Sequence, residues 1–511
     1  AQTFEVDGIN YNVLSEAEGT VEVANGNYSG DVVIPASVAY NDREYAVTTV
    51  GDHAFYTCDN LTSVSMPSVT AIGNTAFGSC ASLTSVSMPS VTTIGDRAFI
   101  DCSSFVSVNM PVATTIGDEA FYLCSALTSV SMPSVTTIGN AAFWSCSSLT
   151  SVSIPASCTS IGDGVFLYCS TLEEITVDED NMYYSSLEGV LYDKNKETIL
   201  CCPCNKVSID MPTTVTAIGD YAFCQNKYLT SVSMPAVTTI GFGAFYNCYA
   251  LTSVSMPSAT TIGGFAFGEC YALTSVFMPS VTMIGDWAFS TCDALTSVSM
   301  PSVTMIGERA FYACDALTSV SMPSAMTIGD WAFCWGYALT SVDMPSVTTI
   351  GEYAFYDCSA LTSVDIPASV TMIGNNAFSE CSGLDSVYCH WEQPLECAPN
   401  FYETVLENAT LYVPTGTVDA YSSTFPWSEF ANIEEGGYSG IADTPQSEVT
   451  VKVIDGVITV EGGDGTASAP VVEVYSAGGQ CIWRGTDSSI GGLPRGVYVV
   501  KVDSTVQKVA L

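Results

Sequence analysis

Residues 83–99 have the sequence LTSVSMPSVTTIGDRAF, and nearly the same sequence recurs from about residue 61 to residue 384. A phenylalanine marks each copy, and neighbouring copies are 22 or 23 residues apart except across one long gap between Phe166 and Phe223. A fixed period of this length predicts a solenoid, in which each copy forms one coil. One coil cannot bury its apolar face alone, but stacked coils cover one another. The marker residues are Phe55, Phe77, Phe99, Phe121, Phe143, Phe166, Phe223, Phe245, Phe267, Phe289, Phe311, Phe333, Phe355 and Phe378.

Each coil is expected to be rich in β-structure. In residues 85–88 serine and apolar side chains alternate, which predicts a short strand, and Pro89 ends that strand because proline has no N–H group. Residues 91–94 predict a second extended piece, and Gly95 permits a turn. Residues 96–99 are expected to form a single helical turn with the aspartate as its cap. A helical-repeat fold fits poorly, because every unit contains Pro and Gly and few Lys or Glu.

The chain contains 21 cysteines, and more than half of them follow the repeat. They lie three residues after the marker phenylalanine, as do Cys58, Cys80 and Cys102. A residue type that recurs at the same position of every repeat is most simply explained as part of the core. A free thiol can pack there as a small apolar group. We therefore predict a ladder of buried thiols. Disulfides between coils remain an alternative, because a sequence does not give their geometry.

The pattern Leu-x-x-Val-x-(Met/Ile)-Pro, followed by Ile-Gly and then Ala-Phe-x-x-Cys, resembles the BspA-like leucine-rich repeats of bacterial surface proteins. The resemblance covers most of residues 30–415. It implies a β-rich leucine-rich repeat solenoid with about 22–23 residues per coil. It also implies the organisation of the chain: an N-terminal β cap and degenerate first coil at 1–50, the solenoid at 51–400 with an irregular insert at about 173–210, and a C-terminal cap at 401–435.

The last part of the chain has a different pattern. Residues 436–447 are rich in Gly and Ser and predict a linker, and residues 448–511 alternate like strands separated by Gly turns, which predicts a small all-β sandwich. The sequences VYSAGGQ (474–480), LPRGVYVVKV (493–502) and the final KVAL resemble the sorting domain of the type nine secretion system of Bacteroidetes. This resemblance implies export across the outer membrane. A generic immunoglobulin-like module is the alternative.

The composition excludes several classes of partner. The chain has 12 Lys and Arg against 53 Asp and Glu, and its net charge is -41. Such a charge repels the phosphates of nucleic acids and of anionic lipids, so no nucleic acid is expected to bind. No apolar run approaches the roughly 18 residues that would span a membrane, so no membrane insertion is expected. The chain starts at Ala1 and Gln2, as an exported protein would after cleavage, and we expect an extracellular or outer-membrane surface location reached through the periplasm.

No catalytic or cofactor site is recognisable. The two histidines, His53 and His390, have no nucleophile or carboxylate at a known motif spacing. The CCPC sequence at 201–204 could join Cys389 in a zinc site, but packing or a local disulfide is the simpler interpretation. The acidic stretch 178–181 lacks the ligand spacing of a calcium loop. We predict no enzyme activity, no cofactor and no metal.

The variable positions around Ala-Phe change along the chain. They hold mostly small or charged residues up to residue 166 and many aromatic residues beyond residue 220. Stacked coils would align these rings into a band, and exposed aromatic groups often mark binding surfaces. The alternative is that the rings only cover the gaps between coils. The candidate binding residues are Tyr221, Phe242, Tyr246, Phe265, Tyr271, Trp287, Tyr312, Trp331, Trp335, Tyr353 and Tyr356, beside the acids Asp286, Glu308, Asp330 and Glu352.

The family resemblance implies a non-enzymatic secreted or cell-surface adhesion protein that binds host matrix proteins, host cell-surface proteins or other cells. Acids beside the aromatic band favour a basic protein partner, whereas a neutral glycan would use the same rings and be almost indifferent to salt. Two alternatives remain. One is a structural fibre or coat formed by self-association of the rods, and the other is a glycan-binding accessory protein or an enzyme.

Overall fold

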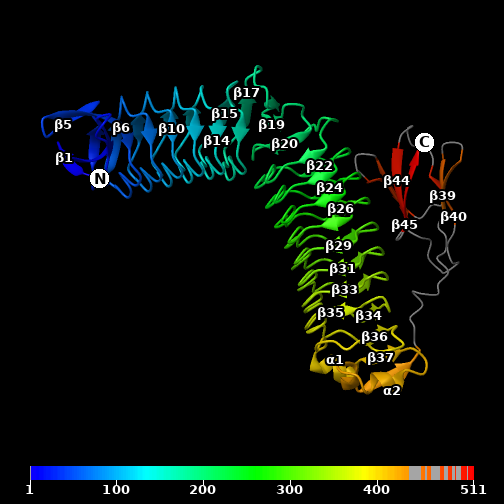
Figure 1. Cartoon of the computed structure of the whole chain (residues 1–511). Helices are drawn as coiled ribbons and strands as arrows, with labels where there is room; N and C mark the ends of the chain where they lie inside the picture. Colours follow the sequence, from blue (N-terminus) through cyan, green and yellow to red (C-terminus); the bar gives the residue numbers. More distant parts are fainter. Residues whose placement is uncertain are drawn as a thin grey trace. The chain divides into compact units, whose positions relative to one another are not determined.

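The computed structural model describes residues 2–436 and, beyond them, seven strands between residues 450 and 510 (Figure 1). The chain falls into two compact units. Unit 1 comprises Ala1–Val207, Thr214–Tyr228 and Gly243–Cys248, and unit 2 comprises Ser208–Thr213, Leu229–Phe242 and Tyr249–Leu511.

Unit 1 begins with a β cap that continues into the first coils. Strands β1, β2 and β3 are antiparallel neighbours, β3 pairs with β6 in parallel, and β5 pairs with β6 in an antiparallel hairpin. The short strand β4 pairs in parallel with the first coil strand, β7. The bounds are β1 (Thr3–Val6), β2 (Ile9–Ser15), β3 (Thr20–Val23), β4 (Gly30–Val33), β5 (Ser37–Tyr40) and β6 (Arg43–Val50).

The coils of unit 1 each contribute two short strands that pair in parallel with the same residues of the next coil. Thr93 and Ile94 face Thr115 and Ile116, for example, which is a shift of one repeat. The first strands are β7 (Leu61–Ser65), β9 (Ser85–Ser87), β11 (Ser107–Asn109), β13 (Ser129–Ser131), β15 (Ser151–Ile154) and β17 (Glu174–Val177). The second strands are β8 (Ala71–Ile72), β10 (Thr93–Ile94), β12 (Thr115–Ile116), β14 (Thr137–Ile138) and β16 (Ser160–Ile161).

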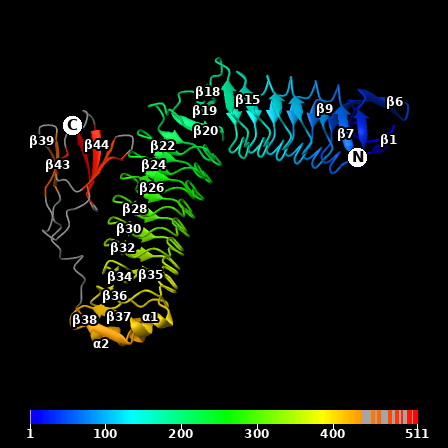
Figure 2. The same ribbon diagram turned by 180° about the vertical axis from the view of Figure 1, so that it is seen from behind.

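Three longer strands lie in the gap of the repeat. They are β18 (Tyr184–Leu187), β19 (Val190–Asp193) and β20 (Thr198–Cys201), which form an antiparallel meander (Figure 2). Strand β20 then pairs in parallel with β21 (Ala217–Ile218), so the regular two-strand pattern resumes. Asn181 is fully buried ahead of the meander, and its side-chain amide donates to the carbonyl oxygens of Pro155 and Cys158.

Unit 2 repeats the same coil. Its first strands are β22 (Ser231–Ser233), β24 (Ser253–Ser255), β26 (Ser275–Phe277), β28 (Ser297–Ser299), β30 (Ser319–Ser321), β32 (Ser341–Asp343), β34 (Ser363–Ile366) and β36 (Ser386–Cys389). Its second strands are β23 (Thr239–Ile240), β25 (Thr261–Ile262), β27 (Met283–Ile284), β29 (Met305–Ile306), β31 (Thr327–Ile328), β33 (Thr349–Ile350) and β35 (Met372–Ile373). Both units therefore confirm the predicted β-solenoid with leucine-rich repeats.

The predicted helical turn at residues 96–99 is wrong. Arg97 and Asp101 have φ values of 57°, which a right-handed helix does not allow. Every second N–H group donates to the next coil, as Arg97 N–H does to the Asp118 carbonyl oxygen at 2.8 Å. Asp96 caps no helix, because its carboxylate accepts the N–H of Asp118 in the next coil at 2.9 Å. Hydrogen bonding between coils thus replaces hydrogen bonding within a helix.

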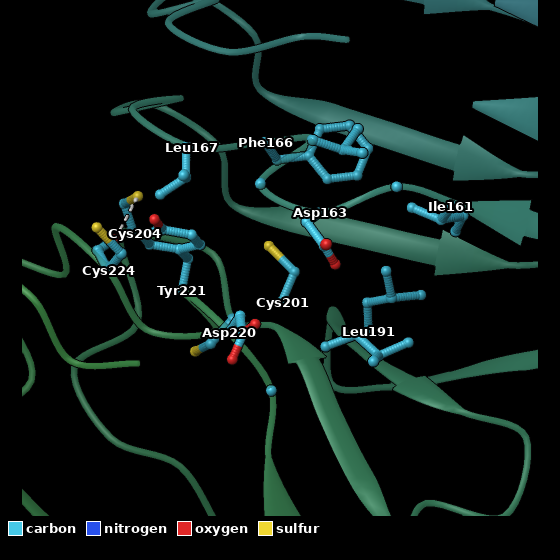
Figure 3. A pocket seen from close by; sticks show the side chains of 16 residues that line it. Ile161, Asp163, Phe166, Leu167, Leu191, Cys201, Cys204, Asp220, Tyr221 and Cys224 are labelled. Atoms are coloured by element: carbon cyan, nitrogen blue, oxygen red, sulfur yellow. Dashed lines mark hydrogen bonds between the residues drawn. The ribbon is translucent and has the colours of Figure 1, made fainter. Parts of the chain in front are cut away.

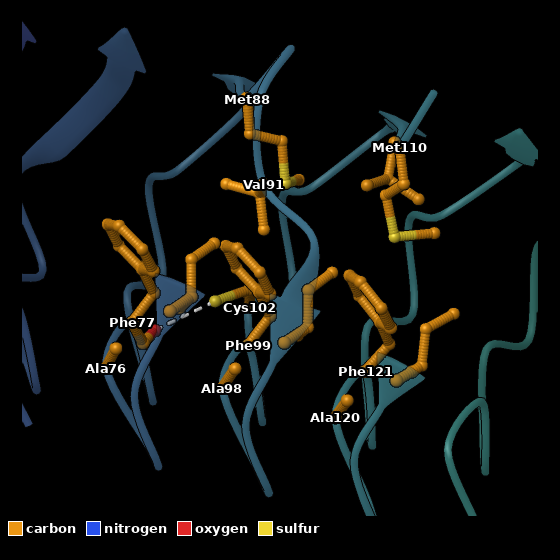
Figure 4. Close-up of a cluster of buried hydrophobic side chains, with 14 of the residues drawn as sticks. Ala76, Phe77, Met88, Val91, Ala98, Phe99, Cys102, Met110, Ala120 and Phe121 are labelled. Atoms are coloured by element: carbon orange, nitrogen blue, oxygen red, sulfur yellow. Dashed lines mark hydrogen bonds between the residues drawn. The ribbon is translucent and has the colours of Figure 1, made fainter. Parts of the chain in front are cut away.

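The core consists of ladders of identical side chains (Figure 4). The rings of Phe77 and Phe99 stack with centroids 5.0 Å apart and planes 1° from parallel, and in unit 2 Phe289 and Phe311 stack at 5.1 Å. All four rings are almost completely buried. Parallel stacking follows from the strand pairing, because in-register coils place equivalent side chains about 4.8 Å apart.

The predicted thiol ladder is confirmed. The cysteines that the structure describes are all free, and those in the repeat phase are buried. The Cys102 thiol donates to the carbonyl oxygen of Phe77 at 3.0 Å (Figure 4), and Cys314 makes the same contact with Phe289 at 3.1 Å. Each of these two buried thiols therefore has a main-chain hydrogen-bond acceptor in the neighbouring coil.

The Ser and Thr positions of the repeat have a structural role. The Thr92 hydroxyl donates to the main-chain oxygen of Thr70 at 3.1 Å, and the Ser90 hydroxyl donates to that of Pro67 at 2.7 Å. The same bonds recur at spacings of 22 or 23 residues in both units. These hydroxyls link neighbouring coils at the surface, so their repetition needs no functional explanation.

The solenoid ends in a cap that contains the only α-helices in the described residues. Helices α1 (Glu403–Asn408) and α2 (Val418–Tyr421) and the 3-10 turn η1 (Trp427–Glu429) lie among the last strands, β37 (Thr410–Val413) and β38 (Asn432–Glu435). The Trp427 ring is fully buried, and its indole N–H donates to the Leu395 carbonyl oxygen at 2.7 Å. No helix in the described residues is long and apolar enough to cross a membrane.

Two small antiparallel sheets follow after residue 449. One has the order β39-β40-β43 and the other β42-β41-β44-β45. The predicted linker at 436–447 lies almost entirely outside the described residues. The strands are β39 (Thr450–Ile454), β40 (Val457–Glu461), β41 (Val472–Ser476), β42 (Cys481–Gly485), β43 (Ser489–Ile490), β44 (Val497–Val502) and β45 (Thr505–Ala510).

Candidate binding surfaces

One column of side chains dominates the outer surface of unit 2. It occupies the position directly before Ala-Phe, where the main chain has a positive φ between 52° and 60° in five successive coils. The N–H of Trp287 donates to the Glu308 carbonyl oxygen at 2.8 Å, so the coil stacking holds this left-handed conformation, which costs a non-glycine residue free energy. The column consists of Phe265, Trp287, Arg309, Trp331 and Tyr353.

Arg309 completes this column and was not among the predicted site residues. Its guanidinium lies 4.8 Å from the ring centroid of Trp287 and 5.3 Å from that of Trp331, and it forms an ion pair with Glu308. A guanidinium stacks on an aromatic face through the ring quadrupole. The spacing gave the signal, because residue 309 lies 22 positions from both tryptophans.

Rings within this column stack on one another, Phe242, Tyr312 and Tyr356 pack against them, and Trp335 packs against Tyr312. Phe265 stacks on Trp287 at 5.5 Å and Trp331 on Tyr353 at 4.1 Å, with nearly parallel planes. We call the connected set the aromatic stack: Phe242, Phe265, Trp287, Arg309, Tyr312, Trp331, Trp335, Tyr353 and Tyr356.

A second group of rings is more exposed. Tyr249 and Tyr271 stack on each other at 6.0 Å and are 41% and 40% exposed. Partial burial and the carboxylates of Glu269 and Asp293 raise the pKa of Tyr271. Burial and nearby carboxylates, Asp357 first, also raise the pKa of Tyr337, which is 44% exposed. These rings therefore expose apolar surface close to negatively charged carboxylates.

Two predicted residues lie elsewhere. Tyr221 and Tyr246 belong to unit 1. Tyr221 forms part of the wall of a cavity (Figure 3), and burial followed by Cys224, Asp220 and Asp163 raises its pKa. Tyr246 is half-buried, and its carbonyl oxygen accepts the N–H of Gln225 at 2.8 Å.

The geometry of the aromatic stack limits what it can bind. Phe265 with Trp287 and Trp331 with Tyr353 present ring faces to each other, so those faces are closed to a ligand. Sugars stack on open ring faces, whereas exposed rings beside carboxylates suit the cationic side chains of a protein. Exposed ring area is therefore concentrated at Phe242, Tyr249, Tyr271, Trp335 and Tyr337, which are 37–44% exposed.

The histidines have ordinary local contacts. His53 meets Tyr56 edge-on at 5.7 Å, and the His390 ring nitrogen lies 2.5 Å from the Asp365 carboxylate. In the part of the chain that the structure describes, no group of three or more His, Cys, Asp or Glu side chains is placed to hold a metal ion. The same holds for the three cysteines between residues 201 and 204.

The fold and the repeat define a leucine-rich repeat solenoid. The family model described as "BspA type Leucine rich repeat region" matches residues 92–187, 196–314 and 304–422, and this chain belongs to that family. The predicted family is thus confirmed, while the Bacteroidetes origin and the sorting domain remain predictions.

Solved structures of bacterial leucine-rich repeat proteins share the fold. One from Eubacterium ventriosum is 27% identical over 73% of this chain and 93% of that chain, with a TM-score of 0.54. A leucine-rich cell surface protein from Faecalibacterium prausnitzii is 28% identical over 67% and 95%, with a TM-score of 0.51. The pneumococcal vaccine antigen PcpA is 18% identical over 85% and 98%, with a TM-score of 0.54, and shows similarity of fold alone. No curated protein matches this chain.

Proposed function

We propose that this chain is a non-enzymatic cell-surface binding protein whose unit 2 contacts a basic protein partner. The observation that carries the proposal is the set of exposed rings among carboxylates, Phe242, Tyr249, Tyr271, Trp335 and Tyr337 beside Glu269, Asp293, Asp315 and Asp357. The name of the Faecalibacterium relative supports a surface location.

Charge favours a cationic partner. The chain has 41 more acidic than basic residues, and a long negative surface speeds the approach of a basic protein. Arg309 also favours a cationic partner, because its own guanidinium already lies between two aromatic rings of unit 2. Arginine and lysine side chains of a partner would find exposed rings and nearby carboxylates at Tyr271 and Tyr337.

The two alternatives receive less support. A glycan-binding role needs open ring faces, and the stacked pairs of unit 2 use theirs against each other. End-to-end strand pairing at the C-terminal cap is disfavoured, because β38 is the last strand of its sheet among the described residues and carries Glu434 and Glu435; association of rods through their repeated flanks stays a prediction. Charged residues on an edge strand oppose pairing with another chain.

Binding should depend on the exposed rings. An array of basic and neutral matrix proteins and glycans first identifies what the unmodified chain binds. We expect a Tyr271→Ser and Trp335→Ser double variant to bind that partner with more than tenfold lower affinity. Its melting temperature should change little, since both rings are more than one-third exposed. Raising the salt concentration should slow association, because screening weakens the attraction between the acids and a basic partner.

A matched control tests whether the loss of any exposed tyrosine would weaken binding. Tyr402 in the C-terminal cap is 45% exposed, and Tyr402→Ser should leave binding unchanged. Normal binding by the double variant would place the contact surface elsewhere. Salt-independent binding to a neutral glycan would instead support the glycan alternative.

We also propose export across the outer membrane by way of residues 447–511, on the strength of the sequence resemblance of that region. Deleting residues 496–511 should leave a folded solenoid inside the cell, because those residues carry the matching motif and the terminus. Protease treatment of intact cells, followed by immunoblotting of the fractions, measures this. Normal display of the truncated chain on the cell surface would refute the sorting role.

A further inference from the structure

The phenylalanine ladder is interrupted at the insert of unit 1. In regular coils the N–H of the ladder phenylalanine donates to the alanine carbonyl oxygen of the next coil, as Phe99 does to Ala120 at 2.7 Å. The N–H of Cys202 makes this bond with the Ala222 carbonyl oxygen, also at 2.7 Å. Cys202 therefore occupies the ladder position with a thiol, which is much smaller than a phenyl ring.

A cavity of about 90 Å³ lies at this position (Figure 3). Its inner wall is apolar and includes Phe166, Leu167 and Leu191, while the exposed Asp163 and Asp220 lie at its rim. Four cysteines line it: Cys201, Cys202, Cys204 and Cys224. All of these residues belong to unit 1.

These thiols differ from those of the regular ladder. Ladder thiols such as Cys102 and Cys124 are completely buried and donate to a phenylalanine carbonyl oxygen at 3.0–3.1 Å. Cys201 is half-buried, Cys204 and Cys224 are 7% and 5% exposed, and the Cys204 sulfur has a long contact of 3.8 Å with the main-chain oxygen of Cys224. Figure 3 shows the Cys204 and Cys224 side chains next to each other on one wall of the cavity.

We propose that Cys204 and Cys224 form a thiol–disulfide site that a small disulfide oxidises through this cavity. This thiol–disulfide site is independent of the proposed binding role. The cavity gives a small oxidant access to this pair, while the regular ladder is closed to it. A bond between residues 204 and 224 would join the insert to the coil that follows it, where the core lacks a phenylalanine ring.

The reaction balances as a thiol–disulfide exchange. One thiolate attacks a sulfur of the small disulfide, forms a mixed disulfide and releases one thiolate. The second thiolate then attacks the protein sulfur of the mixed disulfide, which forms the Cys204–Cys224 bond and releases the other half of the reagent. Two protein thiols are oxidised, the reagent is reduced to two thiols, and the two protons from the cysteines go to the released thiolates.

Burial should make the reaction slow at neutral pH. It raises the pKa of Cys204 to about 11, partly offset by Lys227, and only the thiolate is nucleophilic. The rate of oxidation should therefore rise about tenfold per pH unit between pH 7 and pH 10 while the fold stays intact.

The test uses the full chain in its reduced form with 2-hydroxyethyl disulfide, a small uncharged disulfide, as the probe. After oxidation, free thiols are alkylated under native conditions and again after unfolding, and peptides are mapped by mass spectrometry. We expect one cross-link between the peptides that contain Cys204 and Cys224, while Cys102 and Cys314 stay reduced until the chain is unfolded. Oxidation should also raise the melting temperature, because a cross-link between coils restricts the unfolded chain.

Two variants make the result specific. Cys204→Ser should abolish the cross-link, whereas Cys248→Ser, which removes a ladder thiol of the same unit, should leave it intact. A cross-link from Cys201 instead, or free thiols at both Cys204 and Cys224 after prolonged oxidation, would overturn the proposal. So would oxidation of ladder thiols at the same rate. The wild-type mapping stands by itself, so the outcome does not depend on a variant that folds.

Discussion

A Phe267→Ala variant should lose about 3–5 kcal/mol of unfolding free energy, as other large deletions in close-packed cores do. The Phe267 ring is completely buried and stacks on Phe289 at 5.2 Å with planes 7° from parallel. Its removal leaves a cavity that the neighbouring coils cannot fill, because strand pairing fixes their spacing. Urea unfolding followed by circular dichroism measures the loss.

Phe242→Ala is the matched control, since Phe242 lies in the same unit and is 42% exposed. Its cost should stay below about 1 kcal/mol, in line with surface substitutions. Equal losses for the two variants would contradict the division between ladder phenylalanines and outer rings.

The buried thiols, inside and outside the ladder, should make the protein unstable in alkali. Burial raises the pKa of Cys158 to about 11 and those of Cys124, Cys314 and Cys334 to about 12, from an ordinary value of 9.0. The folded state thus holds these protons more tightly than the unfolded state. Below pH 9 both states keep them and the stability is fully present, whereas above pH 9 the unfolded state loses them first and the free energy of unfolding falls.

The expected effect is large. Each of these thiols removes about 1.4 kcal/mol per pH unit once the pH exceeds its unfolded pKa. The losses from the four thiols add, so the free energy of unfolding should fall steeply between pH 9 and pH 11. Urea midpoints measured between pH 7 and pH 11 under reducing conditions test this.

A double variant provides the control for the alkaline effect. Cys124→Ala with Cys314→Ala should be less stable at pH 7 but should lose stability less steeply above pH 9, because two titrating groups are gone. A midpoint that stays constant up to pH 11 in the original chain would show that the thiols are not held in the core as the structure places them.

Much of the fold could be predicted from the sequence, because the 22-residue repeat spacing shows which positions are equivalent in every coil. The 22-residue phase of Phe99 and Cys102 identified core positions, and the alternation around Val86 identified the first strand. The turn after Gly95 could not be predicted, because Asp96 and Arg97 have no preference strong enough to show a left-handed main chain. Hydrogen bonds to the next coil decide that conformation, and they exist only once coils have stacked.

The candidate site was predictable in part. Repeat spacing placed Trp287, Trp331 and their neighbours on one side of unit 2, and the structure brings them together. Arg309 shares the regular spacing of the two tryptophans, but it is not aromatic, and only the folded chain shows its guanidinium between their rings. The outward extent of each ring, and hence the importance of Tyr249 and Tyr337, depends on packing between coils.

The in-register ladders have a consequence for how this chain can vary. The ladder side chains of a regular coil pack on their own counterparts 22 residues away, as Phe77 does on Phe99, and the Thr92 hydroxyl donates to the main-chain oxygen of Thr70. Deleting or duplicating one whole unit therefore recreates these ladder and main-chain contacts at the new junction. Recombination between the nearly identical repeats of its gene would change the number of coils and leave the fold intact. Mutation can thus lengthen or shorten the solenoid by whole repeat units, and the free energy that stabilises each remaining coil stays the same.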